Sequence, residues 1–136
     1  MSGRSFLDTN VLVYLYTNDD LLKKAQALAV SGQGDVWLST QVLIEFSNVA
    51  ARKLRIPWQG IEAAVNEFSD DFLVHKTTPD TIIKATWLAH RYQLSWFDSL
   101  IVTAALDCGC ETLYSEDFSA GQRFEERLTV VNPFKN

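Results

Sequence analysis

The feature that most constrains the fold is a strand-like apolar run that stops abruptly at an acidic residue near the N-terminus. The apolar pair Phe6-Leu7 is followed at once by the polar run Asp8-Thr9-Asn10. Apolar residues return at Val11, Leu12 and Leu15, the spacing of one helix face. Because open α/β sheets bind ligands beyond the carboxyl ends of their strands, Asp8 is a candidate site residue. A polar turn in which Asp8 or Asn10 caps the helix explains the same pattern.

Length and composition indicate one folded domain. The chain has 136 residues, of which 47% are hydrophobic and 21% charged, both ordinary values for a globular protein. We therefore expect a single domain over residues 1–136. No apolar stretch approaches the roughly 20 residues that span a bilayer, and the N-terminal Met1-Ser2-Gly3-Arg4, which shows no apolar core or cleavage site, is not expected to belong to a secretory signal. The sequence thus predicts a cytoplasmic protein without a membrane partner.

The formal net charge of −5 limits the ways in which the chain can bind nucleic acid. Broad, non-specific binding of phosphates depends on Lys and Arg, and the negative balance argues against it. An enzyme acting on nucleic acid is still compatible with this charge, because carboxylates that hold a divalent cation make the formal charge negative.

The cysteines and histidines do not indicate a metal or nucleophile site. Cys108 and Cys110 are far in sequence from His75 and His90, and zinc sites need about four ligands. We therefore expect two reduced, partly buried thiols. His75 is interpreted as a strand-end side chain, because no nucleophile motif accompanies it.

Strand-like and helix-like segments alternate along the chain. The expected strands cover about residues 6–7, 36–38, 72–75, 112–114 and 128–131, and the expected helices about residues 11–16, 21–30, 41–54, 58–69, 79–93 and 95–106. Right-handed crossovers between such strands give a parallel sheet. We expect an α/β fold whose central, mostly parallel, twisted sheet of four to five strands has helices on both faces.

Glu45 is a second candidate acid. It lies beside Val42 and Val49 on its expected helix, at the edge of the apolar stripe, where a carboxylate needs a partner. An ordinary Glu that reaches solvent explains the position equally well. Arg52, seven residues further along the same side, is either a contact for a substrate phosphate or a solvated arginine near a helix C-terminus.

Asp98 is a third candidate with two compatible interpretations. Ser95 and Asp98 have the spacing of a capping box, which would explain the acid structurally. The helix that follows is apolar almost all round, and Asp98 shares its face with Ile101 and Val102. A carboxylate at the head of a buried face needs a metal or a hydrogen-bond network, so we favour a functional role beside the cap.

The last expected acid follows the strand at residues 112–114, in the run Ser115-Glu116-Asp117. Ser115 and Asp117 share a face if the strand persists. If the backbone turns one residue earlier, Glu116 becomes the inward acid instead.

These acids are expected to meet at one edge of the sheet. Asp8 and Asp117 follow strands, whereas Glu45 and Asp98 lie early in helices that border the same edge. Four gathered carboxylates repel one another, and a hard dication such as Mg²⁺ or Mn²⁺ relieves the repulsion. A metal so held activates a bound water and neutralises charge on phosphate. The pattern therefore favours metal-assisted phosphodiester hydrolysis.

The chain resembles PIN-domain proteins, in particular the VapC-type toxins of bacterial and archaeal toxin–antitoxin modules. The matching segments are Phe6-Leu7-Asp8-Thr9-Asn10-Val11-Leu12, Ser39-Thr40-Gln41-Val42-Leu43-Ile44-Glu45-Phe46, Ser95-Trp96-Phe97-Asp98-Ser99-Leu100-Ile101, Leu113-Tyr114-Ser115-Glu116-Asp117-Phe118 and Val130-Val131-Asn132-Pro133-Phe134. Each motif is weak alone, but their order and spacing over nearly the whole chain make the resemblance specific.

The resemblance implies a Mg²⁺-dependent endoribonuclease in which a metal-bound water attacks RNA. The residues that match the family's acidic quartet are Asp8, Glu45, Asp98 and Asp117, with Asn10 and Ser115 in support. It also implies a homodimer and a VapB-type antitoxin whose tail enters the active site.

Two other functions are weighed against this one. Phosphatases of the haloacid dehalogenase type also place an Asp after the first strand, in an Asp-x-Asp pattern, but here the second position is Asn10 and no downstream Lys motif is evident. Such an enzyme would form an aspartyl-phosphate on Asp8. The chain could also be a non-catalytic PIN-domain scaffold or RNA-binding protein, against which the intact acidic quartet argues.

Overall fold

The computed structural model describes residues 3–134 and contains one six-stranded sheet. The spatial order is β3-β2-β1-β4-β6-β5, and every neighbouring pair is parallel except β5 and β6. The strands are β1 (Arg4–Leu7), β2 (Asp35–Ser39), β3 (Leu73–His75), β4 (Thr112–Tyr114), β5 (Arg123–Phe124) and β6 (Leu128–Val131). Residues 1–2, part of the N-terminal stretch judged not to be a secretory signal, lie outside the described range.

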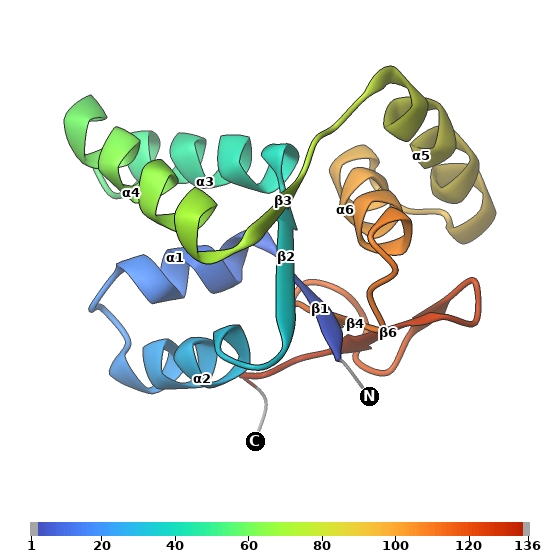
Figure 1. Cartoon of the computed structure of the whole chain (residues 1–136), viewed down its shortest axis with the longest axis horizontal. Coiled ribbons are helices and arrows are strands. Elements are labelled where there is room, and N and C mark those ends of the chain that lie inside the picture. The colour runs from blue at the N-terminus through green and yellow to red at the C-terminus, as the bar shows by residue number, and fades with distance from the viewer. Residues whose placement is uncertain (1–2, 135–136) are drawn as a thin grey trace.

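Six helices within residues 3–134 cover the sheet from two sides (Figure 1). They are α1 (Thr9–Tyr16), α2 (Leu21–Ser31), α3 (Thr40–Arg52), α4 (Trp58–Asp71), α5 (Pro79–Tyr92) and α6 (Trp96–Asp107). Helices α1 to α4 lie on one side of the strands and the α5–α6 pair on the other. The predicted α/β fold with helices on both faces is therefore confirmed. None of the helices in this part of the chain is long and apolar enough to cross a bilayer.

The sheet contains a topological switch between β1 and β4. From β1 the chain moves outward to β2 and then β3, and after β3 it crosses by α5 and α6 to β4 on the opposite side of β1. The crossovers on the two sides of β1 therefore run in opposite directions and leave a crevice at the carboxyl ends of β1 and β4. This crevice is where open α/β sheets bind their ligands.

The sheet has six strands, one more than the upper limit of the four to five that were predicted. The strand that was not predicted is β5, which has no recognisable sequence pattern. This strand is two residues long and pairs antiparallel with β6. Its buried Phe124 is followed by Glu125 and Glu126, both with positive φ, so the backbone turns back at once to β6. Two residues are too few for the alternation that identifies a strand.

Helix α6 is enclosed on nearly all sides. All eight residues from Ser99 to Leu106 are buried, in agreement with the helix being apolar almost all round. The helix begins at Trp96 with Ser95 as its N-cap, which places Asp98 in the first turn. Packing therefore fixes the helix whose first turn borders the crevice.

We predict that the turn before β2 tolerates only glycine at position 34. Gly34 has a φ of 68°, and a Cβ there would overlap the carbonyl oxygen of Gly3 beside the first pair of β1 and β2. Gly121 is a matched control, since its φ is 83° but a Cβ would meet nothing within 4 Å. Both alanine variants carry the left-handed backbone cost, and Gly34→Ala should lower the free energy of unfolding by at least about 1 kcal/mol more. Urea unfolding of both variants tests this; equal losses would contradict it.

Candidate active site

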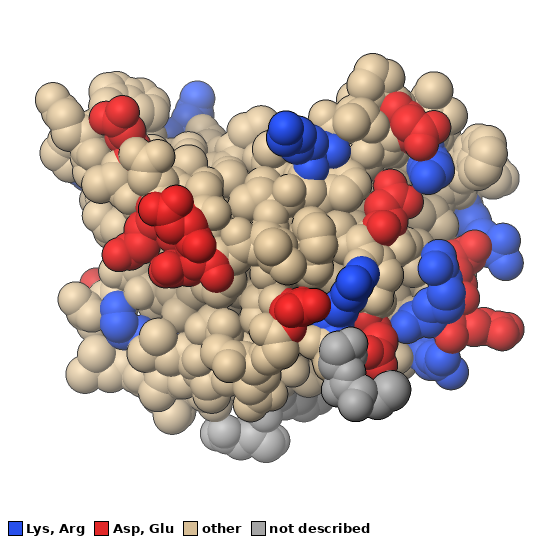
Figure 2. Space-filling view, in the orientation of Figure 1, with Lys and Arg blue, Asp and Glu red and all other residues tan. Residues whose placement is uncertain are grey.

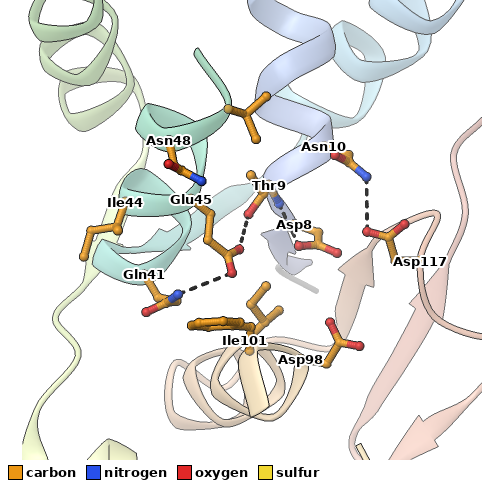
Figure 3. Close-up of a pocket in the computed structure, with 12 residues that line it drawn as sticks. Asp8, Thr9, Asn10, Gln41, Ile44, Glu45, Asn48, Asp98, Ile101 and Asp117 are labelled. Carbon is orange, nitrogen blue, oxygen red and sulfur yellow. Dashed lines mark hydrogen bonds between the residues drawn. The ribbon is translucent and has the colours of Figure 1, made fainter. Parts of the chain in front are cut away.

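The four predicted acids line one pocket at the carboxyl edge of the sheet (Figure 3). The pocket has a volume of about 520 Å³ and opens over the switch between β1 and β4. Its wall consists of Asp8, Thr9, Asn10, Gln41, Ile44, Glu45, Asn48, Val49, Phe97, Asp98, Ile101 and Asp117. Residues from the ends of two strands and from α1, α3 and α6 are thus gathered in one place. Their catalytic roles stay predictions.

Asp8 both caps a helix and faces the pocket. It is the N-cap of α1, and its Oδ1 accepts a hydrogen bond of 2.7 Å from the Thr9 amide. Its Oδ2 accepts a second bond of 2.6 Å from the Ser115 hydroxyl. The residue is only 4% exposed. The two interpretations of this acid, cap and site residue, are therefore compatible, and Asn10 is not the cap.

The pKa of Asp8 is raised from its ordinary value of 3.8 to about 7. Burial, which removes water from the carboxylate, is the largest cause. The hydrogen bonds from Ser115 and Thr9 lower the pKa and oppose burial, whereas the negative charges of Asp117 and Glu45 raise it further. A carboxylate held in this way favours a proton or a cation beside it.

Ser115 and Asn10 fix the position of Asp117. The Ser115 oxygen that donates to Asp8 also accepts the Asp117 amide at 3.0 Å. The side-chain amide of Asn10 donates to Asp117 Oδ2 at 3.1 Å. Partial burial raises the pKa of Asp117, and the charges of Glu116 and Asp98 add to the effect. The two predicted supporting residues thus contact the acids directly.

Asp117, and not Glu116, is the acid that lines the pocket. Glu116 is held elsewhere by two residues of the first helices: Tyr14 donates to its Oε1 at 2.5 Å and Lys23 to its Oε2 at 3.1 Å. Lys23 also donates to the Tyr14 hydroxyl at 3.0 Å. The sequence left open whether Glu116 or Asp117 is the inward acid. Asp117 is, because Glu116 is paired with Lys23 and Tyr14 outside the pocket.

Glu45 reaches the pocket from α3 and is tied to the start of α1. Thr9 Oγ1 donates to Glu45 Oε1 at 2.6 Å, and Gln41 Nε2 donates to Glu45 Oε2 at 3.3 Å (Figure 3). Neither Thr9 nor Gln41 is among the site residues predicted from the sequence. Gln41 could have been found from its i, i+4 spacing to Glu45, whereas the contact of Thr9 arises only from the fold.

Asp98 uses only its backbone in the helix cap. The Ser95 hydroxyl accepts the Asp98 amide at 3.3 Å, but within residues 3–134 the Asp98 carboxylate makes no hydrogen bond. The predicted capping box is therefore half formed. The carboxylate is left facing the pocket opposite Asp8 (Figure 3).

Arg52 lies apart from this group. It is the last residue of α3, is exposed, and is not among the residues that line the pocket. No Lys or Arg from the described part of the chain lines the pocket at all. Within residues 3–134, the four carboxylates consequently lack a cationic partner.

A comparison with known proteins identifies the fold family. A family model described as PIN domain matches residues 5–122. The chain belongs to the PIN domain family. A comparison with curated protein sequences finds no match.

Several solved structures share the fold of this PIN domain. They include the sarcin-ricin loop cleaving toxin VapC20 of Mycobacterium tuberculosis, with a TM-score of 0.68, 24% identity and coverage of 85% of this chain and 91% of the other. A toxin–antitoxin complex from Klebsiella pneumoniae has a TM-score of 0.70, 19% identity and coverage of 97% and 99%. VapBC-1 of nontypeable Haemophilus influenzae has a TM-score of 0.69, 17% identity and the same coverage.

The donor chemistry of the PIN domain pocket suits a hydrated magnesium ion. All four charged groups are carboxylates, the ligands that Mg²⁺ prefers. Within residues 3–134, no group of three or more His, Cys, Asp or Glu side chains is arranged so that it could hold a metal ion. Mg²⁺ keeps several waters and is usually held by only one or two protein carboxylates plus substrate phosphate, so the type of donor in this pocket, though no complete ligand set, is the one that Mg²⁺ needs.

The cysteines of the PIN domain are separate from this pocket. Cys108 and Cys110 are free and buried at the end of α6 and the loop after it. They are more enclosed than the partly buried thiols that the sequence suggested. His75 ends β3, as interpreted, and its Nε2 lies 3.8 Å from Asp107 Oδ2.

We predict that Asp8→Asn stabilises the metal-free PIN domain at high pH. Asparagine can still accept from the Thr9 amide. In the folded state Asp8 keeps its proton up to about pH 7, whereas in the unfolded state it loses the proton near pH 3.8. The free energy of unfolding of the wild type therefore falls as pH rises from about 3.8 to about 7. This difference corresponds to at most about 4 kcal/mol. The variant should therefore melt several degrees higher than wild type at about pH 8, with the gain shrinking towards about pH 4.

The matched control is Asp20→Asn, because Asp20 is the exposed N-cap of α2 and accepts the Lys23 amide. Melting curves with a chelator present, recorded across the pH range, compare the two variants. A gain at Asp8 that does not change with pH would contradict the burial of a charged carboxylate as its cause.

Proposed function

We propose that this PIN domain is a metal-dependent endoribonuclease that hydrolyses RNA phosphodiester bonds. The observation that carries the proposal is the meeting of Asp8, Glu45, Asp98 and Asp117 around one pocket with no cationic side chain of the described residues among them. Such a group is electrostatically unfavourable unless a cation enters it. Mg²⁺ is the proposed cofactor, and Mn²⁺ is a substitute with the same oxygen preference.

Three of the acids share one task in this proposal, and Glu45 has another. Asp8, Asp98 and Asp117 would hold the cation, directly or through water. A bound dication lowers the pKa of water and neutralises charge on the phosphate. Glu45 is oriented by Thr9 and Gln41, and each carboxylate oxygen keeps a free lone pair with which to accept a proton from the attacking water. Ser115 and Asn10 position Asp8 and Asp117.

The biological setting is proposed from the structural neighbours. They include a toxin that cleaves the sarcin-ricin loop and several toxin–antitoxin complexes. We propose that this chain is likewise the toxin of a VapBC-type pair, acts in the cytoplasm as a homodimer, and is restrained by a VapB-type antitoxin. Arg52 is proposed as a contact for an RNA phosphate beyond the pocket, since it follows Glu45 by two turns of α3.

The phosphatase alternative is less well supported by the contacts. In an Asp-x-Asp enzyme the second acid works beside the first, but here Asn10 donates its side-chain amide to Asp117. Asn10 therefore positions Asp117 and cannot act as the second acid of an Asp-x-Asp pair.

We predict that Asp98→Asn abolishes RNA cleavage and growth inhibition while leaving the fold intact. The substitution removes a pocket charge but keeps the amide that Ser95 accepts. Asp80→Asn is the matched control, because Asp80 also lies in the first turn of its helix, α5, and is not among the pocket residues. Cleavage of structured and unstructured RNA by the purified variants, with Mg²⁺ or Mn²⁺ and with a chelator, tests the prediction.

Three results would count against the proposal. Cleavage that continues in the presence of chelator would contradict metal dependence. Binding of RNA without cleavage at any metal concentration would favour the scaffold function. A covalent phosphate on Asp8 after reaction with a phosphomonoester would favour the phosphatase.

We further predict that Mg²⁺ binds more tightly as pH rises to about 7 and that binding releases a proton. Asp8 is protonated below about pH 7 in the metal-free protein and must lose that proton to hold a cation. The affinity should increase by up to about tenfold per pH unit below pH 7 and then level off. Titration calorimetry in two buffers of different ionisation enthalpy measures the released proton. Asp8→Asn should abolish the release, and an affinity independent of pH in the wild type would contradict the prediction.

A further inference from the structure

The pocket has an apolar, exposed wall beside its acids. Phe97 and Ile44 both line it, yet their exposed fractions are 57% and 64%. Phe97 directly precedes Asp98 in the first turn of α6, and Ile44 directly precedes Glu45 on α3. Two large hydrophobic side chains are thus kept in contact with water next to two of the acids, although the rest of α6 from Ser99 to Leu106 is buried.

Neutral amide groups accompany this apolar wall. Gln41 and Asn48 line the same pocket from α3, four residues before and three residues after Glu45. The side-chain amide of Gln41 donates one hydrogen bond to Glu45, and the side chain of Asn48 makes no hydrogen bond within the described range of the chain. Side-chain amides can both donate to and accept from the polar edges of a nucleobase.

Cationic side chains of the described residues are absent from the lining of this pocket. No Lys or Arg of residues 3–134 lines it, and the net charge of the chain is −5. Figure 2 shows that on the face it displays Lys and Arg lie in separate groups, mostly beside Asp and Glu, and do not form a continuous stripe. Binding through phosphate contacts alone is therefore weak, and a contact with the bases becomes important.

We propose that Phe97 is a stacking platform for the nucleobase next to the cleaved phosphate, and that Gln41 and Asn48 contact the edge of that base. The inference rests on the proposed ribonuclease function and specifies its substrate: RNA with an unpaired base at the cleaved bond. An aromatic side chain can stack only on a base that has left the duplex. The pocket volume of about 520 Å³ lies in the range of roughly 300–1,000 Å³ typical of small-ligand sites, which is room for one nucleotide.

The position of Phe97 next to Asp98 links binding of the base to placement of the phosphate of that nucleotide. Phe97 and Asp98 are consecutive residues in the first turn of α6, whose following residues Ser99 to Leu106 are buried, so their spacing is set by helix geometry. A base stacked on Phe97 therefore places the adjoining phosphate at the acids without a cationic clamp. Trp58 makes a useful contrast, because it is 72% exposed but lies at the start of α4 and outside the pocket lining.

The experiment combines protein variants with abasic RNA. A single-stranded RNA cleaved by the wild type is made again with the base removed on either side of the cleaved bond, and also as a full duplex. Steady-state cleavage is measured for wild type, Phe97→Ala, Phe97→Tyr and the control Trp58→Ala. Loss of one stacked base should lower kcat/KM by about 5-fold to about 150-fold.

We expect Phe97→Ala to lose this factor on intact RNA and to be insensitive to the abasic change on one side of the bond. Phe97→Tyr should retain activity, Trp58→Ala should match wild type, and the duplex should be cut poorly by all. Full activity of Phe97→Ala, or losses that simply add when the variant and the abasic RNA are combined, would overturn the proposal. Loss of dimer or antitoxin binding in Phe97→Ala with unchanged cleavage would assign Phe97 to a protein interface and also overturn it.

Failure of the ribonuclease proposal is distinguishable from failure of this inference. If the wild type cuts no RNA, the first fails, and the second is then judged by binding alone. Fluorescence anisotropy with Asp98→Asn and the double variant Asp98→Asn/Phe97→Ala compares intact and abasic single strands. Equal binding of both strands by both variants would reject the stacking platform.

Discussion

The hydrogen bond between Ser115 and the buried Asp8 carboxylate is the contact on which the site depends. It joins the ends of β1 and β4, the two strands that flank the topological switch. The same Ser115 oxygen accepts the amide of Asp117, so the placement of one acid follows from the placement of the other. Burial raises the pKa of Asp8 to about 7, although the hydrogen bond from Ser115 lowers it. The fold therefore holds the carboxylate in an environment that disfavours its charged form. That environment favours cation binding.

The two neighbouring acids Glu116 and Asp117 differ in whether a cationic side chain compensates their charge. Glu116 is paired with Lys23 and accepts from Tyr14, so its charge is compensated within the chain. Its neighbour Asp117 receives only neutral donors, from Asn10 and the backbone. Adjacent acids in sequence thus have different partners, and only the uncompensated one lines the pocket. An external cation, from solution or from a partner, is what the uncompensated group lacks.

The sequence predicted the meeting of the acids because their positions follow from general rules. Strand ends carry Asp8 and Asp117, and parallel strands bring such ends to one edge. It could not decide between Glu116 and Asp117, since that depends on Tyr14 and Lys23, which are about a hundred residues away in sequence. It also missed Thr9, whose hydroxyl meets Glu45 only after α1 and α3 pack together. Strand β5 was missed because two residues carry no periodicity.

The pocket combines two surfaces with opposite requirements. Its acids repel phosphate until a cation is present, whereas its exposed Phe97 and Ile44 gain most from leaving water. A substrate that satisfied only one surface would bind weakly. In the proposed function, a nucleotide with a free base would satisfy both, since its phosphate would bind the cation and its base would cover the apolar wall. Because Phe97 and Asp98 are consecutive residues of α6, the proposed stacking would make binding of the base and placement of the phosphate one event.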